Sequence, residues 1–107
     1  MVKVVKTSEE YAAVLKENKV VIVYFHATWC GPCKMIAPKY EGFSTKYTGA
    51  VFVKLDVDEV PDVAEKEGIS SMPSFLIFVD GQRVGEIVGA NPAKLEAEIK
   101  KHVPAAE

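Results

Sequence analysis

The side chains best suited to chemistry are the chain's two cysteines, Cys30 and Cys33, which follow the apolar run at residues 20–25. A helical pattern begins at them, so both are expected in the first turn of a helix. Side chains three apart on a helix share one face, with Cβ atoms roughly 5–6 Å apart, whereas a disulfide needs about 3.5–4.5 Å. A small local change closes the ring, which predicts a disulfide that forms and breaks easily.

The start of a helix also favours a thiolate. Unpaired backbone N–H groups and the positive end of the helix dipole stabilise an anion there and lower the pKa of a thiol. Cys30 comes first, beside Trp29 and Gly31, and is predicted to be the exposed nucleophile. Cys33 lies one turn inside and is predicted to be the more buried, resolving thiol. Pro32 suits the first helical turn, where its missing N–H costs nothing.

Composition excludes several classes of protein. The 107 residues predict one domain, 1–107, with a proper core. A net charge of −2 with mixed signs provides no basic stripe, which argues against nucleic-acid binding. No apolar run approaches a membrane span, and residues 1–3 begin a strand pattern, not a signal peptide. Two cysteines cannot build a disulfide scaffold, so a reducing, cytoplasmic location is expected.

The elements that position the cysteines follow from apolar periodicity. Residues 20–25 lack alternation, which is typical of a central strand covered on both faces. Thr7 and Glu10 match a capping box, Asn91-Pro92 match a helix start, and Asp80-Gly81 predicts a type I′ hairpin turn. Strands are predicted at 2–5, 20–25, 51–57, 74–79 and 83–88, and helices after Thr7, after Cys30, near Pro61 and at Pro92. This order gives a mixed sheet with helices on both faces, and residues 104–107 should fray.

Residues 27–34, Ala-Thr-Trp-Cys-Gly-Pro-Cys-Lys, resemble the active site of the thioredoxin family. A lone Cys-x-x-Cys would be weak evidence, because zinc sites use it too. Here Met72-Pro73 and Gly89 also fall where that family has landmarks, so the resemblance covers essentially the whole chain. It implies the α/β thioredoxin fold, a central mixed five-stranded sheet flanked by four helices.

The resemblance also implies a function, that of a thiol–disulfide oxidoreductase that reduces protein disulfides. Cys30 would attack a substrate disulfide, and Cys33 would resolve the mixed disulfide. Thioredoxin reductase would recharge the Cys30–Cys33 disulfide, with NADPH as the indirect electron source and no cofactor bound to the chain itself. No nucleic-acid or membrane partner is expected.

A docking surface is implied as well. Met72-Pro73 matches the family's cis-proline loop, which packs against the disulfide and would turn the Met72 backbone groups toward an extended substrate segment. Gly89 matches a glycine that leaves apolar surface open. The surface expected around Cys30 comprises Trp29, Gly31, Pro32, Met72, Pro73, Val88, Gly89 and Ala90. Such a patch suits brief docking of many proteins; a monomer is expected, with a weak dimer through the patch left open.

One position departs from the family pattern. Six residues before the first cysteine the family typically has a buried aspartate, thought to accept a proton from the resolving thiol; here that residue is Tyr24. A phenol with a reference pKa of about 10 is a poor base near neutrality. Tyr24 is therefore interpreted as structural, with water or the Cys30 thiolate taking the proton. Lys54 would lose its usual partner and turn toward solvent. Active-site support is assigned to Trp29, Gly31, Pro32, Lys34, Pro73, Tyr24 and Lys54.

Other titratable residues are given modest roles. His26, four residues before Cys30, would lower the thiol pKa as an imidazolium, but a packed histidine is the favoured interpretation. His102 is interpreted as a solvated partner of a helix C-terminus. The charged residues Lys34, Asp56, Asp58 and Glu59 are assigned mainly to solvated surface, and Asp56 and Asp58 to substrate choice at the patch edge.

Two alternatives remain. A disulfide isomerase or oxidant-like domain would use the same cysteines, but Gly31-Pro32 between them, the missing signal peptide and the ending Ala105-Ala106-Glu107, which is no retention signal, argue against it. A zinc-binding module of a different class would take Cys30, Cys33, His26 and His102 as ligands. Its two histidines lack a paired spacing.

Overall fold

The computed structural model describes residues 1–103, so the predicted fraying of residues 104–107 lies outside the described part. The elements in chain order are β1 (Val2–Val5), α1 (Ser8–Glu17), β2 (Val20–His26), α2 (Gly31–Lys46), β3 (Val51–Asp56), α3 (Pro61–Lys66), β4 (Ser74–Val79), β5 (Gln82–Val88) and α4 (Pro92–His102). The strands form one five-stranded sheet in the order β1-β3-β2-β4-β5. The predicted element order and mixed sheet are confirmed.

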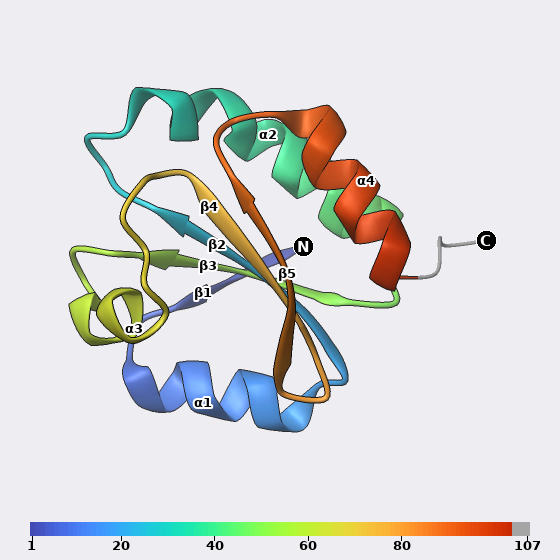
Figure 1. Cartoon of the computed structure of the whole chain (residues 1–107), viewed down its shortest axis with the longest axis horizontal. Coiled ribbons are helices and arrows are strands. Elements are labelled where there is room, and N and C mark those ends of the chain that lie inside the picture. The colour runs from blue at the N-terminus through green and yellow to red at the C-terminus, as the bar shows by residue number, and fades with distance from the viewer. Residues whose placement is uncertain (104–107) are drawn as a thin grey trace.

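Strand β2 lies at the centre of the sheet. It pairs parallel with β3 and antiparallel with β4. Figure 1 shows α2 and α4 over one face of the sheet and α1 and α3 over the other. Residues 20–25 are consequently all buried, which explains why their sequence is apolar without alternation.

Successive residues of β2 point to opposite faces and enter two separate apolar layers. Ile22 and Tyr24 pack in the layer beneath α2 and α4, together with both cysteines. Val23 and Phe25 pack in the layer beneath α1 and α3. By the same alternation, His26 shares the face of Tyr24 and lies on the side of the sheet that carries the cysteines.

The helix starts largely follow the predicted capping chemistry. Thr7 Oγ1 accepts the Glu10 N–H at 3.0 Å, as the capping box requires. The Glu10 carboxylate, however, accepts the Lys6 N–H at 2.8 Å, one residue earlier than that motif predicts. Asn91 caps α4 by accepting the Lys94 N–H at 3.1 Å.

The hairpin between β4 and β5 turns at Asp80-Gly81, as predicted. Asp80 has φ +53° and Gly81 has φ +78°, and a type I′ turn needs positive φ at both central residues. Strand β5 begins at Gln82, one residue earlier than expected. The hairpin brings the far end of β5, at Val88, back alongside Ser74 at the start of β4.

Candidate active site

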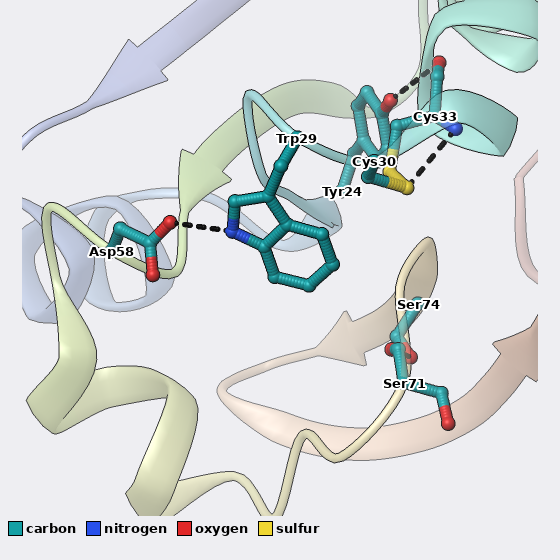
Figure 2. Close-up of a disulfide and its surroundings, with 7 residues drawn as sticks. All are labelled: Tyr24, Trp29, Cys30, Cys33, Asp58, Ser71 and Ser74. Carbon is teal, nitrogen blue, oxygen red and sulfur yellow. Dashed lines mark hydrogen bonds between the residues drawn. A yellow bond between two sulfur atoms is a disulfide. The ribbon is translucent and has the colours of Figure 1, made fainter.

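Cys30 and Cys33 form a disulfide at the N-terminus of α2, with their Cα atoms 5.3 Å apart. Cys30 is the N-cap residue of the helix, and its Sγ accepts the Cys33 N–H at 3.2 Å (Figure 2). Pro32 lies in the first turn, where the sequence placed it. A thiolate at Cys30 would be met by this N–H and by the helix dipole, and both lower a thiol pKa.

The prediction that Cys30 is the exposed thiol is wrong for the disulfide form. The two cysteines are almost equally buried, with 4% of Cys30 and 3% of Cys33 exposed. The Cys30 sulfur turns back over the first turn of α2 to bond Cys33, so it points into the protein instead of out. Hydrogen bonding at the helix start, more than exposure, therefore distinguishes the two sulfurs.

The Met72-Pro73 peptide bond is cis, as the resemblance implied. Met72 is half-buried and packs against the apolar layer that contains both cysteines. Ser74 Oγ donates to the Ser71 carbonyl at 2.6 Å and closes the loop. The Pro73 carbonyl accepts the Gly89 N–H at 2.9 Å, which ties the loop to the end of β5.

The expected docking surface is only partly exposed. Trp29 and Val88 are 66% and 56% exposed, and the other exposed members are Gly31, Pro32 and Ala90. Met72 and Gly89 are half-buried. The assignment of Pro73 to an exposed contact surface is corrected, because this residue is buried where the loop enters the sheet.

Met35 is an exposed apolar residue that the sequence reasoning missed. It lies on α2 and is 78% exposed. The signal was available in its spacing, since residues three apart on a helix share one face and Met35 follows Pro32 by three. Met35 therefore extends the apolar surface along α2.

Asp58 contacts the active-site tryptophan directly. Its Oδ2 accepts the Trp29 Nε1–H at 2.9 Å (Figure 2). Asp56 is 9% exposed, and its Oδ1 accepts the Asp58 N–H at 2.8 Å. The assignment of Asp56 to solvated surface is therefore corrected: its carboxylate is turned inward to shape the segment that holds Asp58.

Tyr24 lies beneath the first turn of α2. Its hydroxyl donates to the Cys33 carbonyl at 2.9 Å (Figure 2), and its ring centroid lies 5.0 Å from those of Tyr40 and Phe75. Burial raises the pKa of Tyr24 to about 12. The phenol stays protonated near neutrality, which supports the interpretation of Tyr24 as structural.

A cavity of about 180 Å³ lies beside Cys33. Its lining residues are Val2, Tyr24, His26, Ala27, Thr28, Cys33, Lys34, Ala37, Tyr40, Glu41 and Lys54. Lys54 is half-buried in this lining, so the expectation that it turns toward solvent is corrected. Lys34 is exposed, as expected.

His26 is half-buried in the same lining and packs against Tyr24, with ring centroids 5.2 Å apart. Burial lowers the pKa of His26, and the neighbouring Asp56 opposes this shift. The imidazole is consequently uncharged near neutrality and supplies no cation to stabilise a thiolate. A packed histidine, the favoured interpretation, agrees with these contacts.

The zinc-binding alternative requires cysteines and histidines to meet. His102, at the end of α4, lies with its Nε2 4.0 Å from a Glu98 carboxylate oxygen. Among residues 1–103, no three His, Cys, Asp or Glu side chains are grouped so that they could hold a metal ion.

The same part of the chain contains no helix long and apolar enough to cross a membrane.

Comparison with known proteins finds similarity over nearly the whole chain. The family profile described as thioredoxin matches residues 2–101. Thioredoxin-1 of Schizosaccharomyces pombe is 52% identical over 103 residues, which cover 96% of this chain and 100% of that one. The solved Plasmodium falciparum thioredoxin superposes with a TM-score of 0.93 at 48% identity, covering 94% of this chain and 99% of its own. Oxidised mitochondrial thioredoxin 3 of Saccharomyces cerevisiae has a TM-score of 0.90 at 41% identity, covering 94% of each chain.

Proposed function

Because this chain belongs to the thioredoxin family, we propose that it carries electrons from a thioredoxin reductase to the disulfides of other proteins. The chain is a thiol–disulfide oxidoreductase. The observation that carries the proposal is the Cys30–Cys33 disulfide at the start of α2, where the Cys30 sulfur accepts a backbone N–H. NADPH would supply the electrons through the reductase, and the chain would need no bound cofactor.

In the first step, the Cys30 thiolate attacks one sulfur of a substrate disulfide. A mixed disulfide forms between Cys30 and the substrate, and the other substrate sulfur leaves as a thiolate. The Cys33 N–H, 3.2 Å from the Cys30 sulfur in the disulfide form, supports Cys30 as the attacking residue because it stabilises negative charge there.

In the second step, Cys33 attacks the Cys30 sulfur of the mixed disulfide. The Cys30–Cys33 bond forms, the bond to the substrate breaks, and the substrate leaves fully reduced. Cys33 suits this role because it stands one helical turn from Cys30, so the ring closes with little movement.

Substrates would dock on the exposed apolar residues around the disulfide. Trp29, Met35 and Val88 are each more than half exposed. A small apolar surface of low relief suits brief contact with many proteins better than one permanent partner.

We propose that the chain acts as a monomer in the cytoplasm, where two reducible cysteines operate as a dithiol. Because one relative is a mitochondrial protein, the location is to be tested directly.

The proposal is tested by NADPH consumption in the presence of thioredoxin reductase and a protein with a surface disulfide. Wild type is compared with Cys30→Ser and Cys33→Ser. We expect turnover only with wild type, and a trapped mixed disulfide only with Cys33→Ser, because that variant retains the nucleophile and lacks the resolving thiol. A trapped adduct in Cys30→Ser instead would reverse the two roles.

The isomerase or oxidant alternative predicts a different outcome. The disulfide would then accept electrons from dithiothreitol but not from the reductase, and the oxidised chain would introduce disulfides into a reduced protein. Measurement of the Cys30–Cys33 reduction potential against glutathione distinguishes the two, because a reductase disulfide is the harder one to reduce.

A further inference from the structure

Cys33 must lose a proton before it can attack, and the structure restricts where that proton can go. Only 3% of Cys33 is exposed, so bulk water has little access to its sulfur. The backbone N–H of Cys33 is directed at Cys30, not at the Cys33 sulfur. The route that remains open is the cavity of about 180 Å³ that Cys33 helps to line.

This cavity can hold water. A volume of about 30 Å³ corresponds to one water molecule in the liquid, and a buried water needs two to four polar partners. The lining offers such partners from three elements: His26 from β2, Lys54 from β3, and Lys34 and Glu41 from α2. Water inside it would connect Cys33 to these side chains without a direct contact.

Few of these groups can accept a proton from Cys33. The Tyr24 hydroxyl donates its proton to the Cys33 carbonyl, and the ammonium groups of Lys34 and Lys54 have no free lone pair. Glu41 is exposed, so its carboxylate is in contact with solvent. His26 is the half-buried side chain of the lining whose neutral ring has a nitrogen lone pair free to accept a proton.

The surroundings of His26 favour a neutral ring that takes up a proton only transiently. Asp56 pairs with His26 on the adjacent strand β3. Lys54 lies two residues earlier on β3, on the same face of the sheet, and Glu59 follows β3 in the chain. Burial lowers the pKa of the imidazole, Asp56 and Glu59 raise it, and Lys54 lowers it. A neutral imidazole of this kind has a nitrogen lone pair that can accept a proton and release it again.

We propose that His26 is the proton acceptor for Cys33, acting through water in the cavity between them. The inference rests on the proposed thiol–disulfide exchange. In the mixed-disulfide state the Cys33 thiol gives its proton to His26, and the Cys33 thiolate attacks the Cys30 sulfur. The substrate sulfur leaves as a thiolate with the bonding electron pair. The His26 imidazolium then returns its proton to that thiolate or to solvent, so atoms and charge balance.

The two chemical steps can be separated with DTNB, an aromatic disulfide that releases a coloured thiolate in each step. The first release reports attack by Cys30 and the second reports resolution by Cys33. In wild type, the second rate should rise with pH through an inflection below about pH 6.5, the ordinary imidazole value. In His26→Phe, which keeps an aromatic ring against Tyr24, it should fall at least about tenfold at neutral pH and lose the inflection.

Glu41→Gln is the matched control. Glu41 is, besides His26, the side chain of the same lining that could act as a base, and the substitution removes its carboxylate. It should keep the wild-type second rate and pH profile. Added imidazole should restore part of the second rate in His26→Ala, which leaves space in the cavity. A second phase that His26→Phe leaves unchanged, or that Glu41→Gln slows instead, would overturn the inference.

A measurement on the unmodified chain covers the case in which the variants fold poorly. The inflection of the second phase should coincide with the His26 pKa measured by NMR of its ring. An inflection of the second-phase rate at a different pH would contradict the proposal. Loss of the first release in wild type would be a failure of the exchange activity itself, distinct from a failure of His26.

Discussion

The sulfur of Cys30 occupies the place in which a helix usually carries an oxygen cap. An N-cap side chain normally accepts an N–H from the first turn, and here a thiolate-forming sulfur accepts it from Cys33 at 3.2 Å. The same hydrogen bond therefore caps the helix in the disulfide form, and its N–H would stabilise charge on the Cys30 sulfur when the disulfide is reduced. At this residue, local stability and reactivity have one cause.

His26 should make the folded protein sensitive to acid. Its pKa is lowered by burial, so the unfolded chain binds more protons than the folded one as pH falls through the unfolded value of about 6.5. Its contribution to the free energy of unfolding is complete above that pH and is lost toward the lower, folded pKa. Urea denaturation at about pH 7.5 and about pH 5 should show a smaller loss of stability for His26→Phe than for wild type. Equal losses in the two proteins would contradict this account.

Val88 offers a test of the docking surface at a single side chain. Val88→Glu places a charge on the proposed docking surface and should raise KM for a protein substrate roughly tenfold, with DTNB kinetics changed by less than about twofold. Val84→Glu is the matched control, because Val84 is also exposed on β5, at 43%, but lies about 13 Å further along the strand. Equal effects of the two substitutions would mean that charge, not position, matters.

At the scale of elements, the start of α2 is supported from below by the sheet. Tyr24 on β2 donates to the Cys33 carbonyl, and the Tyr40 hydroxyl on α2 shares its one proton between the carbonyls of Ile22 and Val53, whose oxygens lie 2.9 and 2.7 Å away. These hydroxyls connect helix and sheet in opposite directions. The reactive turn is thereby hydrogen-bonded to the sheet beneath it.

Replacement of two glycines by alanine is expected to change the free energy of unfolding in opposite directions, because their places in the fold differ. Gly89 follows β5 with φ +105°, and its N–H donates to the Pro73 carbonyl, so Gly89→Ala should cost about 1 kcal/mol or more through backbone strain. Gly42 lies inside α2, and a Cβ there would meet nothing within 4 Å, so Gly42→Ala should stabilise by about 0.5–1 kcal/mol. Urea unfolding of both variants measures the two signs. A stabilising Gly89→Ala would contradict the role of positive φ.

In the molecule as a whole, an apolar layer covers each face of the sheet. Buried tyrosines belong to both layers, and their hydroxyls form hydrogen bonds. Tyr11 donates to Glu67 at 2.7 Å in the layer beneath α1 and α3. Tyr24 and Tyr40 belong to the layer beneath α2 and α4. Burial is the largest cause that raises the pKa of each of these three phenols.

The fold should therefore lose stability in alkali. Between the unfolded phenol pKa of about 10 and the higher folded values, the folded chain binds more protons than the unfolded one, so stability falls as pH rises. For Tyr24 the window ends at about 12. The urea concentration at the midpoint of unfolding should be lower at about pH 11 than at about pH 9. This decrease should be smaller for Tyr24→Phe than for wild type. A stability that does not change over this interval would show that folding leaves the phenol pKa values unshifted.

Much of this architecture could be predicted from short-range patterns. The unbroken apolar run of β2 indicated a covered central strand, Thr7 and Asn91 indicated helix starts, and Asp80-Gly81 indicated the hairpin. These signals work because capping, turn geometry and burial each act over a few residues. The burial of Cys30 and Asp56 could not be predicted in this way, since it depends on tertiary packing and not on neighbours along the chain.

The sequence by itself determined the two reactive sulfurs, their spacing at a helix start and the order of elements, because these depend on neighbours along the chain. Only the tertiary structure decided which side chains share the space beside Cys33. Tyr24, His26, Lys54 and Glu41 come from two strands and a helix, and sequence spacing does not show that they line one cavity. Whether a histidine is packing or a base depends on what it faces across such a space, and that is set by how the helices pack on the sheet.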